Sequence, residues 1–236
     1  MSGEGVSDIG ACDNQSVFCE CPSFIPGPMA IFVDQLVEAK FSYSCLEFGC
    51  IRFISEHALS LLGKGLVKPK SPKLSGKRNK KETRFFERNS QALAIKAKAL
   101  STELNDEVIS ILFRDADGPA SSSRGDYEAK RDSMLRGFEL EGYSKGVPMV
   151  PKPKSEAWIL CAVKENPYNH CDSLENASGN DKSPNSLKDQ FDDVMGKHVS
   201  AHELAEMARN RTFDVHQIDM PSMNWFKERL NQVLGF

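Results

Sequence analysis

Residues 107–118 read EVISILFRDADG, an apolar run that ends in two acids placed one residue apart. Large apolar side chains follow one another almost without interruption before the acids: Val108, Ile109, Ile111, Leu112 and Phe113. Such a run is typical of a strand covered on both faces, as in a parallel sheet. The stretch before it, 83–104, is rich in Ala, Leu, Lys and Glu and has the pattern of an amphipathic helix. A helix leading into a buried strand indicates a βαβ unit.

The same alternation continues on both sides of this unit. Residues 126–140 have a second helical pattern, 146–151 (GVPMVP) suit a strand, and Ser155 is a good N-cap for a helix that continues to Val163. Upstream, residues 30–37 (AIFVDQLV) fit a further strand, whereas 41–54 fit either a strand or a helix. The sequence therefore predicts an α/β fold with a mainly parallel sheet flanked by helices.

Three regions follow from the distribution of turn residues. Residues 1–28 are expected to form an irregular arm, and residues 29–165 the α/β domain. Residues 166–236 are expected to form a loop and a helical C-terminal extension that packs on the same domain. Within this extension, Ser200 and Glu203 have the spacing of a capping box, and Pro221 precedes an amphipathic helix.

The composition favours a globular chain that stays in the cytoplasm. Its 236 residues are 40% hydrophobic, yet no run of about 18 apolar residues suggests a membrane span, and the first residues lack the pattern of an export signal. The seven cysteines are odd in number and irregular in spacing, so we expect them to be reduced. Metal binding by Cys12, Cys19 and Cys21 is the weaker alternative, because no paired ligand spacing accompanies them.

Positive charge is concentrated in one segment, although the net charge is only −3. Residues 64–84 carry nine basic side chains against one acid, with prolines and a glycine but few large apolar residues. This segment is either a solvated linker or an arm that contacts nucleic-acid phosphates. The candidate nucleic-acid contacts, including two lysines further along the chain, are Lys70, Lys73, Lys77, Arg78, Lys80, Lys81, Lys152 and Lys154.

The acids after the buried strand are the first candidate site. Asp115 and Asp117 lie two apart on an extended backbone, so they point to the same side and can hold one Mg²⁺ or Mn²⁺ ion. Glu156 follows the next strand and is expected at the same edge of the sheet. Simpler roles remain open: turn formation for Asp117, capping or arginine pairing for Asp115, and a favourable helix-dipole position for Glu156.

These segments resemble a known family. Val37-Glu38-Ala39-Lys40, Asp115-Ala116-Asp117 and residues 148–160 (PMVPKPKSEAWIL) are similar to TOPRIM-like domains, which carry a Glu after the first strand, usually followed by Gly, and an Asp-x-Asp after a later one. The resemblance is to RloB-type proteins and overcoming-lysogenisation-defect nucleases of restriction and phage-defence loci, over about residues 30–165. The chain departs from the pattern in having Ala39 instead of glycine and no acid soon after Glu38. Asp34 and Glu56 are therefore alternative first acids.

The resemblance implies a doubly wound domain that hydrolyses phosphodiester bonds of DNA or RNA with Mg²⁺ or Mn²⁺. Glu38, Asp115, Asp117 and Glu156 would be its catalytic and metal-binding acids, with Glu38 as a ligand or a general base. It also implies the effector of an antiphage system with an ABC-type ATPase partner. A homo-oligomer is a further expectation. Two alternatives stay open: a binding or assembly subunit of an ATPase complex with little catalysis, and a phosphoryl-transfer enzyme with Asp115 as nucleophile.

Overall fold

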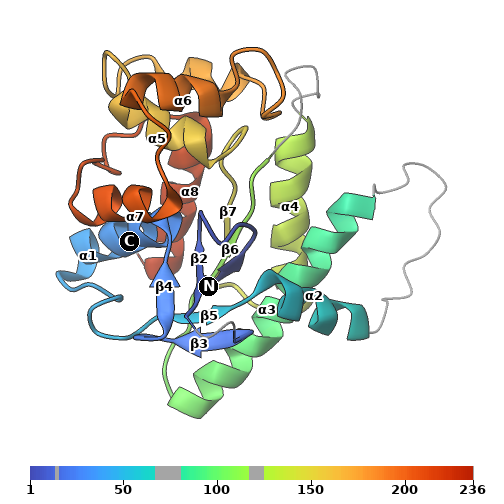
Figure 1. The fold of residues 1–236 in the computed structure, drawn as a ribbon. Helices are drawn as coiled ribbons and strands as arrows, with labels where there is room; N and C mark the ends of the chain where they lie inside the picture. Colours follow the sequence, from blue (N-terminus) through green and yellow to red (C-terminus); the bar gives the residue numbers. More distant parts are fainter. Residues whose placement is uncertain (14–15, 67–80, 117–124, 236) are drawn as a thin grey trace.

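The computed structural model describes residues 1–13, 16–66, 81–116 and 125–235. At the centre of these residues is a parallel three-stranded sheet in the order β1-β6-β7, formed by β1 (Ser2–Gly3), β6 (Ser110–Phe113) and β7 (Gly146–Met149) (Figure 1). Leu112 is paired with Ser2 on one side and with Pro148 on the other. The prediction of a mixed α/β fold with a mainly parallel sheet is confirmed, whereas the TOPRIM-like arrangement stays a prediction.

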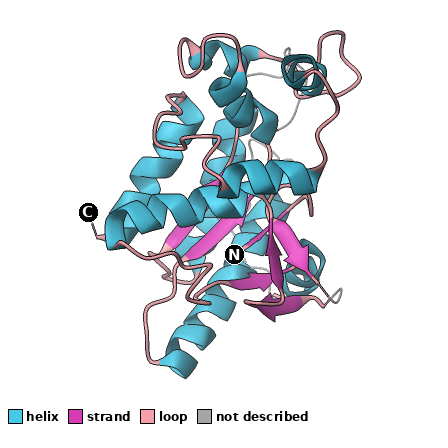
Figure 2. Cartoon of the chain, turned by 60° about the vertical axis from the view of Figure 1, so that its left-hand side comes forward, coloured by secondary structure: helices cyan, strands magenta, loops and turns pink. Residues whose placement is uncertain are grey.

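Helices cover both faces of this sheet (Figure 2). Ile111 and Phe113 belong to one apolar core, together with α1 (Pro28–Phe41), α5 (Ser155–Val163) and α8 (Pro221–Leu234). Leu112 belongs to a second core. That core is formed with α2 (Glu56–Gly65), α3 (Lys81–Leu104) and α4 (Gly125–Leu140). Because side chains alternate across a strand, the continuous apolar run supplies both cores, as the sequence indicated.

The first 28 residues differ from the expected irregular arm. They contain β1 and three further short strands, β2 (Gly10–Cys12), β3 (Phe18–Glu20) and β4 (Phe24–Pro26). β2 pairs with β4, and β3 pairs with β5 (Arg52–Ile54), both antiparallel. These strands are two or three residues long, too short for an alternating pattern to stand out in the sequence.

The predicted strand 30–37 is wrong, because these residues lie in helix α1. The helix begins with Pro28 at its first position, where the missing N–H costs nothing, and every residue from Pro28 to Val37 is buried. A segment buried all round shows no amphipathic period, so its apolar run reads equally well as a strand. The helix ends at Phe41, and Ser42 follows in the left-handed conformation.

The C-terminal region is helical, with η1 (Cys171–Asn176), α6 (Leu187–Met195), α7 (Ala201–Arg209) and α8. The predicted capping box of Ser200 and Glu203 is confirmed at the start of α7. α8 packs onto α5 through the Trp158 indole, which donates a 2.9 Å hydrogen bond to Ser222 Oγ. This contact joins α8 to α5, the helix that follows β7.

The prediction of reduced cysteines is wrong for four of the seven. Cys12 is bonded to Cys19, and Cys161 is bonded to Cys171. The first pair links the last residue of β2 to the middle residue of β3, and the second links α5 to η1. Cys21, Cys45 and Cys50 are free thiols. Sequence spacing does not reveal such pairs, because they depend on which segments the fold brings together.

Among the described residues, no helix has both the length and the apolar content needed to cross a bilayer. The cytoplasmic location remains a prediction.

Candidate active site

The three parallel strands end at one edge of the sheet, and an acidic segment follows each of them. Glu4 and Asp8 follow β1, Asp115 follows β6, and Glu156 lies in the first turn of α5, after β7. In a parallel sheet this edge is where ligands bind, because the connecting loops diverge there. The sequence predicted this convergence for Asp115 and Glu156 but not for the two acids after β1.

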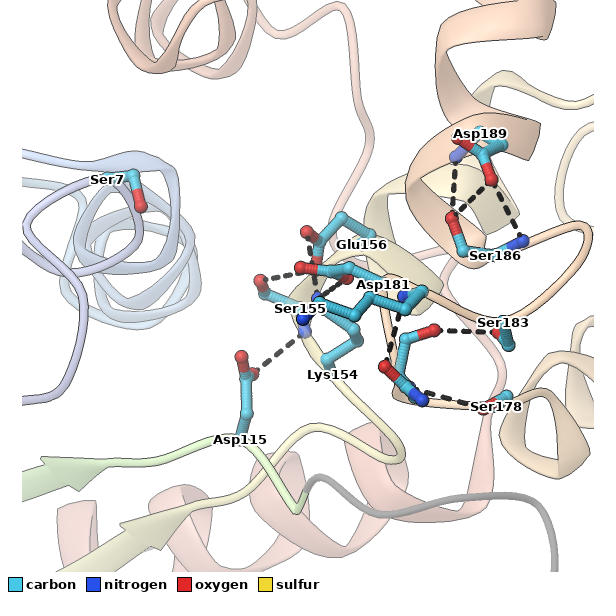
Figure 3. A network of polar contacts seen from close by, with 12 residues as sticks. Ser7, Asp115, Lys154, Ser155, Glu156, Ser178, Asp181, Ser183, Ser186 and Asp189 are labelled. Atoms are coloured by element: carbon cyan, nitrogen blue, oxygen red, sulfur yellow. Dashed lines mark hydrogen bonds and ion pairs between the residues drawn. The ribbon is translucent and has the colours of Figure 1, made fainter.

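Ser155 is the point at which these acids meet. Its backbone N–H donates a 2.9 Å hydrogen bond to Asp115 Oδ1 (Figure 3). Its hydroxyl is within hydrogen-bond reach of Asp8 Oδ1 and lies 3.2 Å from Glu156 Oε2. Ser155 is the first residue of α5 rather than its N-cap, which is Lys154. The positive end of the helix dipole therefore faces the carboxylates and stabilises negative charge at this position.

Lys154 brings a positive charge into the cluster. Its Nζ lies 2.6 Å from Asp181 Oδ1 and 3.5 Å from Glu156 Oε1, and only 10% of its side chain is exposed (Figure 3). Burial lowers the pKa of Lys154, but the hydrogen bond to Asp181 and the charges of Glu156, Asp181 and Asp115 outweigh burial and leave the pKa above its ordinary value. The ammonium group is therefore charged at neutral pH.

The pKa of Glu156 is shifted upward, whereas the pKa of a carboxylate in an ordinary ion pair is shifted downward. Burial raises the pKa of its carboxyl group above the usual value, although the charge of Lys154 opposes this, and the charges of Asp8 and Asp181 add to the increase. Neighbouring acids that repel one another in this way favour a bound proton or cation. Raised acid pKa values at a strand edge are also typical of functional sites.

A tight turn holds Asp8 in the cluster. Asp8 N–H donates to Gly5 O at 3.1 Å, and Gly5 has a φ of 81°, where a Cβ would lie 2.5 Å from Asp8 Oδ2. On the other side of Asp8, its carbonyl accepts a 2.9 Å hydrogen bond from Met29 N. A Cβ on Gly27 would lie only 2.3 Å from the same carbonyl oxygen. The two glycines therefore allow the backbone to place the Asp8 carboxylate beside Ser155.

Glu38, the predicted first acid, does not follow a strand. It lies in the last turns of α1, and its Oε2 forms a 2.5 Å ion pair with Arg211 Nη2. Of the alternatives, Asp34 is buried and accepts hydrogen bonds from Ser44 Oγ at 2.7 Å and Leu46 N at 3.0 Å. Both contacts stabilise the loop after α1. None of the contacts described for Glu38 or Asp34 connects them to Asp115.

Glu56, the other alternative, starts α2 and forms an ion pair with Arg114. Arg114 also binds Glu4, with 2.7 Å between its Nε and Glu4 Oε2. Glu4 follows β1 directly, is followed by Gly5 and precedes another acid, Asp8.

The candidate nucleic-acid contacts are only partly described. Lys70, Lys73, Lys77, Arg78 and Lys80 lie outside the described residues, and Lys81 begins α3 with its side chain not described. Lys152 Nζ lies 3.8 Å from Glu175 Oε2 and 5.8 Å from the centre of the Tyr127 ring. Lys152 and Lys154 thus both form ion pairs with carboxylates of the protein.

The donor set suits Mg²⁺ or Mn²⁺ in kind. Carboxylate oxygens are the ligands these ions prefer, and Mg²⁺ often binds one or two carboxylates and keeps several waters. Asp8 and Asp115 both face Ser155 and can supply two. Within the described part of the chain, no three Asp, Glu, His or Cys side chains are grouped as metal ligands. Asp117, the predicted partner of Asp115, lies outside the described residues.

The prediction from the sequence did not include three residues of this site: Glu4, Asp8 and Asp181. The signal that identifies the first two is the spacing Glu-Gly-x-x-Asp at 4–8, but only two residues, Ser2 and Gly3, form the strand before it. Asp181 belongs to a polar loop whose sequence pattern does not distinguish one acid from another.

Comparison of the chain with models of known protein families, with characterised proteins and with solved structures finds no match.

Proposed function

We propose that the protein is a Mg²⁺- or Mn²⁺-dependent nuclease whose acids are Glu4, Asp8, Asp115 and Glu156, with Asp117 as a further candidate. The observation that carries this proposal is the convergence of Asp8, Asp115 and Glu156 on Ser155 at the carboxyl ends of three parallel strands. The resemblance to TOPRIM-like domains supports it, because Glu4-Gly5 now occupies the position after the first strand of the sheet.

The chain's own groups have distinct tasks in this reaction. Asp8 and Asp115 would hold the cation, which would supply water activation and stabilisation of charge on the phosphate. Ser155 positions both carboxylates, because one residue donates through its backbone to Asp115 and faces Asp8 with its hydroxyl. Glu156 has a raised pKa and a side chain at the same edge, so it is suited to accept a proton from the attacking water. Lys154 and the α5 N-terminus favour an anionic substrate.

The substrate is a nucleic acid by virtue of the resemblance and the basic segment 64–84, of which 67–80 lie outside the described residues. DNA and RNA both remain within the proposal. We propose an ABC-type ATPase partner and a role in antiphage defence on the resemblance alone. The cytoplasmic location is a prediction from the sequence pattern.

Lys154 favours a second candidate, a binding or assembly subunit with little catalysis. Its ammonium already neutralises part of the acidic cluster. In that case the protein would bind its partner and nucleic acid without cleaving them. A cleavage assay separates the two candidates.

The assay uses the purified chain with Mn²⁺ or Mg²⁺ and plasmid, single-stranded DNA or tRNA, alone and with a candidate ATPase partner. The nuclease proposal predicts cleavage that chelator abolishes and that Asp115→Asn reduces, whereas the control Asp172→Asn, an exposed acid of η1, cleaves as wild type. Mass spectrometry of the protein after incubation with small phosphoesters tests the remaining alternative, because a phosphorylated Asp115 would indicate a phosphoryl-transfer enzyme.

A further inference from the structure

We propose that Lys154 is the built-in counter-ion of the acidic cluster and that Asp181 is the positioning residue that draws its ammonium away from the acids when a divalent cation binds. This inference rests on the proposed function, because it concerns cation binding at the same acids. It adds a residue from the C-terminal region, Asp181, to a site otherwise formed by the three strand ends.

The position of Lys154 carries the first step. Its side chain is 10% exposed, and its ammonium contacts both Glu156 of the cluster and Asp181 of the 177–186 loop (Figure 3). The nitrogen is 2.6 Å from Asp181 but 3.5 Å from Glu156. A cation this close to several carboxylates competes electrostatically with any second cation that binds them.

Asp181 is placed to receive the ammonium. The backbone around it is held by hydrogen bonds from Lys182 N to Asn180 Oδ1 at 3.0 Å and from Ser183 Oγ to Asn180 O at 2.6 Å. The Asp181 side chain itself is 57% exposed, so its contact with Lys154 lies at the outer rim of the site. Lys154 can therefore give up Glu156 and keep Asp181 without losing its neutralising partner, and no unpaired charge is left behind.

Substitution of Lys154 and substitution of Asp181 should change the affinity for Mn²⁺ in opposite directions. Lys154→Met removes the competing charge and should tighten Mn²⁺ binding on the order of tenfold. Asp181→Asn leaves the ammonium with the cluster acids alone and should weaken Mn²⁺ binding by about threefold or more. Because Asp181 acts through Lys154, adding Asp181→Asn to Lys154→Met should cause no further change, which a double-mutant cycle measures.

The experiment is a titration of the full chain with Mn²⁺ alone, with free Mn²⁺ followed by electron paramagnetic resonance. Lys182→Gln, which removes a charge from the neighbouring exposed position, is the control and should bind as wild type. Lys154→Arg keeps the charge and should also bind nearly as wild type. This variant keeps the test decisive if Lys154→Met does not fold, because tighter binding by Lys154→Arg would overturn the proposal.

Two further results would overturn the counter-ion role while leaving the proposed function intact. One is unchanged or weaker Mn²⁺ binding by folded Lys154→Met. The other is an equal loss on Asp181→Asn with and without Lys154, which would make Asp181 a direct ligand. Absence of Mn²⁺ binding to wild type and to every variant would instead contradict the metal site itself, and with it both proposals.

Discussion

Substitution of Asp8 and of Glu38 separates the acid that the structure places in the cluster from the acid that the sequence suggested. Asp8→Asn keeps an oxygen that can accept from the Ser155 hydroxyl, so unfolding free energy should change by no more than about 1 kcal/mol. It removes a negative charge from the proposed cation site. Loss of one such stabilising group typically costs about a hundredfold or more in rate, so we expect at least that fall in cleavage.

Glu38→Gln should leave cleavage unchanged. Glu38 is 35% exposed and its partner Arg211 is 57% exposed, so their ion pair is screened by solvent and is worth about 0.2–1 kcal/mol. The measurement for both variants is the initial rate of cleavage with Mn²⁺, together with urea unfolding to show that each is folded. A Glu38→Gln variant that is inactive beside an active Asp8→Asn would refute the placement of the first acid after β1.

Three other predictions concern packing, pH and the disulfides. A Cβ on Gly146 would lie 2.2 Å from the Phe138 ring, so Gly146→Ala should cost about 1–3 kcal/mol in urea unfolding, whereas Gly65→Ala, which meets nothing within 4 Å, should not destabilise the protein. The pKa of Glu156 is raised above 4.5, so the contribution of Glu156 to wild-type stability falls as pH rises from 4.5 through the raised pKa. Glu156→Gln should therefore be the more stable protein at neutral pH, and the difference should disappear in acid. An equal difference in unfolding free energy at both pH values would contradict this. Removing the Cys161–Cys171 bond, which spans 10 residues, should cost about 3 kcal/mol, and an unfolding transition of the Cys161→Ser/Cys171→Ser variant equal to that of wild type would argue against the pairing.

The central part of the fold could be predicted because its two strands are continuous apolar runs and a segment of helix-forming residues lies between them. The apolar run before Arg114 forms β6, GVPM forms β7, and the segment with a helical pattern between them forms α4. The positions of Asp115 and Glu156 at one edge follow from this alternation alone, since parallel strands joined by helices end on the same side. This much of the candidate site is therefore encoded in local pattern.

The remainder depends on tertiary contacts. β1 is only Ser2–Gly3, and it is a strand because it pairs with β6, which no local propensity of serine or glycine indicates. Residues 28–37 of α1 are buried on all sides, so their apolar run lacks the period that separates a helix from a strand. The first acid was consequently placed at Glu38, after a strand that is a helix, and the acids after the true first strand were overlooked.

The disulfides and the role of Asp181 could not be predicted from local sequence patterns, because they too depend on tertiary contacts. Cys161 and Cys171 lie on α5 and η1, and only the packing of these two elements brings the sulfur atoms together. Asp181 reaches Lys154 from a loop 27 residues further along the chain. Contacts of this kind become visible only when the chain is folded.

The most direct test of the proposed metal site is Mn²⁺-dependent cleavage by wild type compared with Asp115→Asn, since Asp115 follows the buried strand β6 and is a proposed ligand of the cation. We predict that wild type cleaves a polynucleotide, that chelator stops the reaction, and that folded Asp115→Asn retains about one hundredth of the rate or less. Cleavage by folded Asp115→Asn at the wild-type rate would contradict it, as would an absence of both Mn²⁺ binding and cleavage in wild type.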